Sequence, residues 1–141
     1  MIQELLKHLL PVPKQRSTAR IYKTDINKLL KGIPETKISD SNYKLVDVKQ
    51  LRKFLRRNLS SARVYRKTVH DCDDFSFILM GDVTRWDSDL AFGIVWAYKP
   101  DGEYHALNVA IGTDRRVCLI EPQNDKVIRD VGGWDLRFVM M

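Results

Sequence analysis

Residues 104–111 read YHALNVAI, and their side chains follow the two-residue period that is typical of a β-strand. The same period is found in AFGIVWAY at 91–98 and in RRVCLIEP at 115–122. The turn sequences KPDGE and GTDR separate these segments, and WDLRFVMM at 134–141 predicts a further short strand. The second half of the chain is therefore expected to form an antiparallel sheet.

Helical patterns precede these strands. QELLKHLL at 3–10 and TDINKLLKGI at 24–33 each carry an apolar stripe at helical spacing. DVKQLRKFLRRNLSS at 47–61 is the clearest helix, because Asp47 can cap it and its apolar residues recur on one face. A second, buried helix is expected to start at Asp71. Helices followed by an antiparallel sheet predict an α+β domain.

The composition is that of one globular domain. The chain has 141 residues, of which 44% are hydrophobic and 30% charged, and its net charge is +6. We expect a single domain with a helical N-terminal segment, 1–42, and a core, 43–141. No apolar run approaches the roughly 20 residues of a membrane helix. The first ten residues do not resemble a signal peptide, so we expect a cytoplasmic protein without a membrane partner.

The hairpin between the second and third strands predicts a polar pair. A three-residue loop closed by Ile111 and Arg115 places His105 opposite Glu121, at the end of an otherwise apolar face. Directly opposed residues have Cβ atoms about 4.5 to 5.5 Å apart. An unpaired polar group would be costly there, so the imidazole and the carboxylate are expected to bind each other or a third group.

Cys72 is expected to lie at the start of the buried helix, where free backbone N–H groups and the helix dipole favour a thiolate. Cys72, His105 and Glu121 then form a nucleophile, a base and a residue that orients the base. The Cys72 backbone N–H is the natural first donor to an oxyanion. The other cysteine, Cys118, is expected to pack in the core, and both are expected to stay reduced in the cytoplasm.

DCDDF at 71–75, YHALNVAI at 104–111 and CLIEPQND at 118–125 resemble the papain-like cysteine peptidases of the agglutinin C-terminal type. This is the catalytic domain of some mushroom lectins of the Marasmius oreades agglutinin kind, with relatives in bacteria and phages. The pattern is distantly similar to bacterial transglutaminase-like cysteine proteinases. The resemblance covers about residues 43–125, and a phage-encoded relative would work in the host cytoplasm.

The resemblance implies a papain-like fold and a thiol protease with Cys72 as nucleophile, His105 as base and Glu121 as third member. The expected reaction is hydrolysis of peptide or amide bonds in a peptide or protein substrate, through an acyl-enzyme. The glutamine that papain-like enzymes keep a few residues before the cysteine is missing here. Tyr65 and Gln50 are the candidates for the side chain that completes the oxyanion hole.

Calcium is the expected cofactor. In the lectin relatives activity depends on calcium, and the aspartates around Cys72 should raise the pKa of its thiol unless a cation offsets them. Asp73 and Asp74 are the expected ligands, with Asp87 and Asp89 as further oxygen donors from RWDSDL. The alternative is that the aspartates only cap the helix and occupy its first turn. Zinc is disfavoured, because His70, Asp71, Cys72 and Asp74 lack the spacing of zinc ligands.

Two alternative functions come from other classes. Eight Lys or Arg residues and no acid occur between residues 49 and 67, and such a stripe could bind the phosphates of a nucleic acid. A solvated helix face is the simpler interpretation. The third hypothesis is a peptidase fold that serves as a phage structural or assembly protein without catalysis. The sequence indicates no oligomeric state.

Overall fold

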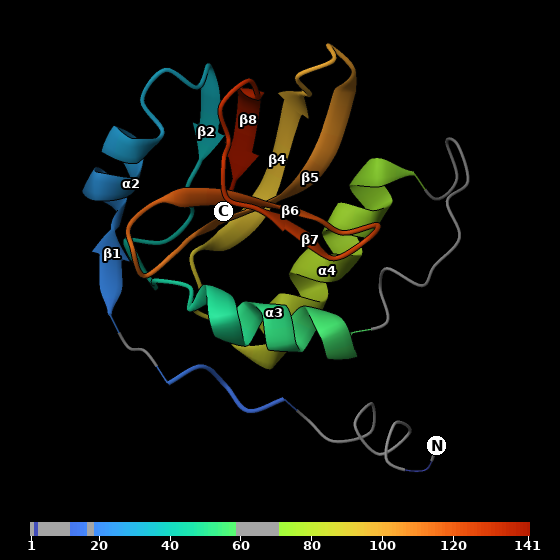
Figure 1. Cartoon of the computed structure of the whole chain (residues 1–141). Coiled ribbons are helices and arrows are strands. Elements are labelled where there is room, and N and C mark those ends of the chain that lie inside the picture. Colours follow the sequence, from blue (N-terminus) through green and yellow to red (C-terminus); the bar gives the residue numbers. More distant parts are fainter. Residues whose placement is uncertain (1, 3–11, 17–18, 59–70) are drawn as a thin grey trace.

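The centre of the molecule is a six-stranded sheet (Figure 1). The computed structural model describes residues 2, 12–16, 19–58 and 71–141. Strand β2 runs parallel to β8, and all other neighbours in the sheet are antiparallel. In sheet order the strands are β2 (Glu35–Lys37), β8 (Asp135–Met140), β4 (Phe92–Tyr98), β5 (Tyr104–Ile111), β6 (Val117–Glu121) and β7 (Lys126–Ile128).

In the described part of the chain, a smaller, two-stranded sheet and three helices surround this centre. The small sheet pairs β1 (Arg20–Tyr22) with β3 (Asn42–Lys44) in antiparallel orientation. The helices are α2 (Lys23–Leu29), α3 (Val48–Arg57) and α4 (Cys72–Trp86). Among the described residues, no helix is both long and apolar enough to cross a bilayer.

The large sheet is covered on both faces. One apolar cluster joins Leu107, Val109 and Leu119 of the sheet to Ile21 and Ile26, which belong to β1 and α2. The opposite faces of the same strands belong to a second cluster with α3 and α4, which contains Leu51, Leu55, Leu79, Val83, Ala110, Cys118 and Ile120. Every residue of β5 after the first is buried, so β5 is the strand around which both halves of the core are built.

Polar bonds fix helix α4 to β5. The buried side chain of Asn108 donates from Nδ2 to the Ser76 carbonyl oxygen at 3.0 Å and to the Gly93 carbonyl oxygen at 3.1 Å. The first bond reaches α4 and the second reaches β4. These bonds therefore fix the position of the first turns of α4, which include Cys72, along strand β5.

The hairpin between β5 and β6 has a longer loop than the sequence predicts. Ile111 pairs with Val117 and not with Arg115. The predicted register is therefore wrong by two residues. Because strand side chains alternate with a period of two, an even displacement leaves every side chain on its predicted face. His105 and Glu121 thus stay on one face, as diagonal neighbours and not as a directly opposed pair.

The predicted fold class, a papain-like α+β domain with N-terminal helices on a small antiparallel sheet, is wrong. The structure is rich in β-strands: the large sheet has six, and residues 20–44, expected to be helical, supply β1, β2 and β3 around the single helix α2. Strand β2 is exposed along its whole length, and its pairing comes from β8, about a hundred residues later in the chain. The residue pattern of a short segment does not indicate a pairing with so distant a strand.

Several individual elements are confirmed. The Asp47 carboxylate caps α3 by accepting from the N–H groups of Lys49 and Gln50. Helix α4 follows Asp71 as predicted, and the predicted strands correspond to β4, β5, β6 and β8. The helix predicted at 3–10 lies outside the described residues.

Candidate functional site

A surface cavity of about 510 Å³ lies where the start of α4 meets the turn between β4 and β5. We call it the Cys72 cavity. Its described lining residues are Cys72, Lys99, Glu103, Tyr104, His105, Glu121, Gln123 and Asn124. The structure thus brings together the three residues that the sequence selects as nucleophile, base and third member, but their catalytic roles stay predictions.

Cys72 is the first residue of α4 and is partly exposed. Its Sγ accepts a hydrogen bond from the Ala106 N–H of β5, with 3.4 Å between nitrogen and sulfur. One turn later, the Ser76 hydroxyl donates to the Cys72 carbonyl oxygen at 2.9 Å. The sulfur therefore lies at the positive end of a 15-residue helix and receives a backbone donor from the sheet.

His105 and Glu121 form a close pair that is largely shielded from solvent. The distance between His105 Nε2 and Glu121 Oε2 is 2.5 Å, and the two side chains are 11% and 16% exposed. The second Glu121 oxygen accepts from the Gln123 N–H at 3.1 Å. Burial alone would lower the pKa of His105. Hydrogen bonds to Cys72 and Glu121, and the charges of both, outweigh burial and raise this pKa to about 9.

The imidazole is therefore protonated at neutral pH. The His105 cation lies between a thiol and a carboxylate, and its hydrogen bonds to them fix the orientation of the ring. Cys118 has no comparable environment. It is 2% exposed in the core beside Ile120, as predicted, and burial raises the pKa of its thiol to about 11.

The two residues proposed for the oxyanion hole are not placed in this cavity. Tyr65 lies outside the described residues. Gln50 lies in the first turn of α3, where its N–H is bound by Asp47, and it is not among the described residues that line the Cys72 cavity. The structure therefore gives Gln50 no contact with the Cys72 thiol.

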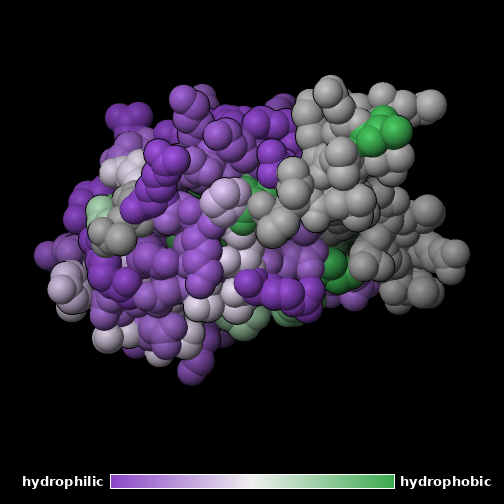
Figure 2. Space-filling view, turned by 90° about the horizontal axis from the view of Figure 1, so that it is seen from below, coloured by the Kyte–Doolittle hydropathy of each residue, from purple (hydrophilic) through white to green (hydrophobic). Residues whose placement is uncertain are grey.

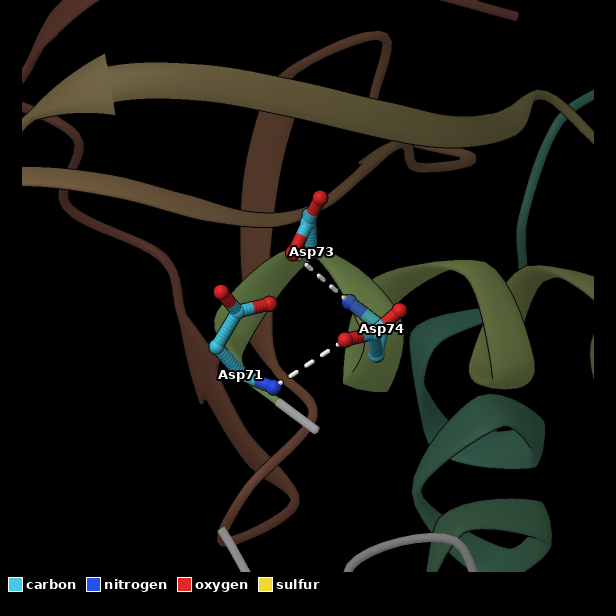
Figure 3. A group of neighbouring side chains, drawn as sticks. All are labelled: Asp71, Asp73 and Asp74. Carbon is cyan, nitrogen blue, oxygen red and sulfur yellow. Dashed lines mark hydrogen bonds between the residues drawn. The ribbon is translucent and has the colours of Figure 1, made fainter. Parts of the chain in front are cut away.

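The aspartates near the two ends of α4 form two separate groups. Asp71, Asp73 and Asp74 each offer an oxygen, and these oxygens lie within 4.8 Å of one another (Figure 3). The Asp71 N–H donates to Asp74 Oδ2 and the Asp74 N–H to Asp73 Oδ1, each at 3.1 Å. The helix-cap interpretation therefore accounts for part of this group. The remaining carboxylate oxygens suit a hard cation such as calcium, whose binding stays a prediction.

Asp87 and Asp89 do not join that group. They follow the carboxyl end of α4, about 20 Å along the helix from its start. Asp87 is buried and forms an ion pair with Lys44 of β3. Asp89 pairs with Arg20 of β1, with 2.5 Å between Asp89 Oδ2 and Arg20 Nη2. Both carboxylates connect the helix end to the small sheet.

The sequence reasoning missed five residues of the cavity. They come from the turns that flank His105 and Glu121 and are Lys99, Glu103, Tyr104, Gln123 and Asn124. The signal was available, because the turn KPDGE and the segment after Glu121 must lie beside the predicted pair once the strands are aligned. Polar turn residues are common, however, and only the fold distinguishes these from a solvated loop.

We expect the stability of the protein to fall between pH 6.5 and 9. The folded pKa of His105, about 9, lies above the ordinary value of 6.5. The imidazolium therefore stabilises the folded state fully below pH 6.5, and this contribution disappears as the pH rises through 9. The loss is on the order of 1–3 kcal/mol. Urea unfolding across this range measures it. His105→Gln should remove the dependence, and an unchanged profile in this variant would contradict the assignment.

We expect iodoacetamide at pH 7 to alkylate Cys72 at least tenfold faster than Cys118. Cys72 faces the cavity beside a cationic imidazole, whereas Cys118 is buried and almost entirely protonated. Peptide mass mapping against time gives both rates. Cys118→Ala should leave the Cys72 rate unchanged, and His105→Gln should lower it. Equal rates at the two cysteines would refute the described environment.

Calcium binding is tested by thermal unfolding and titration calorimetry. If Asp71, Asp73 and Asp74 bind calcium, millimolar CaCl2 should raise the Tm by several degrees, because a ligand of the folded state stabilises it. Asp73→Asn should abolish the shift, and the exposed Asp40→Asn should not. If calcium neither changes the Tm nor gives a heat of binding, these three aspartates serve only to cap the helix.

Comparison with known proteins gives a family and a fold. A family model described as Agglutinin C-terminal matches residues 43–127. No curated protein matches. The fold resembles a solved structure described as "PSL1a-E64 complex", with a TM-score of 0.76 and 20% identity over 86% of this chain and 51% of that one.

A second similar structure is Polyporus squamosus lectin bound to the human-type influenza-binding epitope Neu5Aca2-6Galb1-4GlcNAc. Its TM-score is 0.73 and its identity 20%, over 86% of this chain and 49% of that one. This chain therefore spans about half the length of both structures. At such identity the likeness concerns the fold.

These findings contradict the prediction of a papain-like thiol protease. The family model is that of an agglutinin, and one of the two similar structures is described as a lectin, so hydrolysis of peptide or amide bonds is not supported. The predicted peptide or protein substrate and the alternative nucleic-acid partner are contradicted with it. Nothing in the comparisons supports a phage origin.

The agglutinin part of the sequence resemblance is confirmed. The matched segment, 43–127, begins in β3 and extends into β7, and so contains α3, α4 and the hairpin that carries His105 and Glu121. It covers more than half of the chain. The chain therefore belongs to the agglutinin C-terminal family.

Proposed function

We propose that this domain binds carbohydrate in the Cys72 cavity. The observation that carries the proposal is an exposed aromatic side chain, Tyr104, at the wall of an open cavity whose other described walls are mainly polar. Membership of an agglutinin family supports the same conclusion. The ligand class is an oligosaccharide, and the glycan of the Polyporus lectin is a property of that larger protein.

The polar wall suits a ligand rich in hydroxyl groups. Glu103 and Glu121 supply carboxylate oxygens that accept hydrogen bonds, and Gln123 and Asn124 supply amides that both donate and accept. Lys99 Nζ lies 3.8 Å from Asp101 Oδ2 and 3.9 Å from Glu103 Oε2, so its charge is shared between two acids. Two neighbouring hydroxyl groups of a sugar can each form a hydrogen bond to these carboxylates and amides.

Tyr104 supplies the aromatic surface of the cavity, and Tyr98, which is not among the described lining residues, packs against Tyr104. Tyr98 and Tyr104 face one another across β4 and β5, with ring centroids 5.0 Å apart. They are 43% and 52% exposed, although most large apolar side chains of the described residues are buried. A sugar ring has apolar C–H faces, and an exposed aromatic ring offers them a matching surface at little entropic cost. Tyr104, supported by Tyr98, therefore gives the cavity a stacking surface.

The proposal is tested by a glycan array followed by calorimetry with the best ligand. Tyr104→Ala and Glu103→Gln should each weaken binding at least tenfold, because the first removes the stacking surface and the second a charged acceptor. Tyr22→Ala is the matched control, since Tyr22 is also exposed but lies in β1 and not at the cavity.

Two results would contradict carbohydrate binding at this place. The first is an array on which the folded protein retains no glycan above background. The second is a glycan whose affinity falls equally in Tyr104→Ala and Tyr22→Ala, since that would locate the ligand elsewhere. Near-ultraviolet circular dichroism of each variant shows that the fold is retained.

A further inference from the structure

We propose that the exposed face of α3 binds a polyanionic polysaccharide, one that carries sulfate or carboxylate groups along its length. The face is separate from the Cys72 cavity. Five cationic residues of α3 define it, and we call it the α3 basic face: Lys49, Arg52, Lys53, Arg56 and Arg57.

The α3 basic face is continuous. Lys49, Arg52, Lys53 and Arg56 are three or four residues apart, so they lie on one side of the helix in adjacent turns. All four are exposed, and Arg57 beside them is partly exposed. Leu51, Phe54 and Leu55 face the core from the opposite side. Figure 2, seen from below, looks toward the side on which α3 lies in Figure 1, and that surface is largely hydrophilic.

In the part of the chain that the structure describes, the cations of this face have no acid beside them. Among the described residues, none of the five has a carboxylate oxygen within 4.0 Å of its charged nitrogens. Elsewhere on the surface such neighbours are frequent. The pairs include Arg20 with Asp89, Lys99 with Glu103, Arg129 with Asp114 and Arg137 with Asp135. The positive charge of α3 is therefore available to a partner.

The helix gains little from most of these charges. Lys49 and Lys53, and Arg52 and Arg56, are like-charged neighbours at a spacing of four, which destabilises a helix. Arg56 and Arg57 favour the negative end of the helix dipole, but Lys49 lies in the first turn, where a cation is unfavourable. A mixture of positive and negative side chains would keep this helix face soluble, so solubility does not explain why all five charges are positive. A ligand that carries several anions would give this arrangement a function.

The choice of a polysaccharide among polyanions rests on the proposed carbohydrate function. An extended chain can present anions to successive turns of α3, and arginine guanidinium groups bind sulfate and carboxylate with two parallel hydrogen bonds. Binding of this kind releases counterions and weakens as salt rises. The α3 basic face and the Cys72 cavity would then contact different parts of a glycan-rich surface.

The test measures binding of fluorescent heparin as a function of NaCl concentration. Lys49→Gln/Lys53→Gln should weaken binding at least tenfold at low salt and reduce the slope of log affinity against log salt by about two, one for each lost cation. Lys23→Gln/Lys31→Gln is the matched control. Both its lysines are exposed and lie outside α3, and the same net charge is removed, so heparin affinity should change by less than twofold.

Three results would overturn the proposal: no binding of heparin at low salt, equal weakening in the two double variants, or binding of duplex DNA or phosphatidylserine vesicles as tight as that of heparin. The thermal unfolding curve of each variant checks the fold. The two proposals fail separately, because oligosaccharides that carry no charge report on the Cys72 cavity and should bind Lys49→Gln/Lys53→Gln with unchanged affinity.

Discussion

The attachment of α4 to β5 is the contact on which the candidate site depends. Asn108 bonds to the Ser76 carbonyl oxygen in α4 and to the Gly93 carbonyl oxygen in β4 from the interior of the sheet. The Ala106 N–H reaches the Cys72 sulfur from the same strand. The two Asn108 bonds are buried, so a displaced helix would leave buried polar groups without partners. The position of the thiol relative to His105 is therefore fixed by the packing of α4 on the sheet.

The parts of this arrangement that are encoded locally could be predicted. An apolar run after Asp71 indicates α4, and the alternation of YHALNVAI indicates β5 with both ends correct. The pairing of His105 with Glu121 was predicted with the wrong hairpin register. The pair still forms because the error was two residues and the side-chain period is also two. An error of one residue would have separated the pair completely.

The parts that depend on distant partners could not be predicted. Strand β2 contains no apolar residue, so its sequence does not indicate a strand. It forms because Glu35–Lys37 pairs with the edge of β8. Asp87 and Asp89 are close to Asp73 and Asp74 in sequence but are separated from them by the length of α4. Their partners, Lys44 and Arg20, come from the small sheet that the sequence did not indicate. For the same reason the fold class was wrong although most elements were right.

The two proposed binding surfaces of the domain differ in how their charges are paired. In the Cys72 cavity, Lys99 and the His105 imidazolium lie beside Glu103 and Glu121. The proposed recognition there rests on hydrogen bonds and on the Tyr104 ring. On α3 the cations have no such acids beside them among the described residues, so attraction there acts over about a Debye length and decreases with salt. A ligand of the cavity must fit the shape of the cavity. A ligand of the α3 basic face needs only several closely spaced negative charges. The salt dependence of binding therefore distinguishes the two surfaces in a single protein, because only the second should follow the release of counterions.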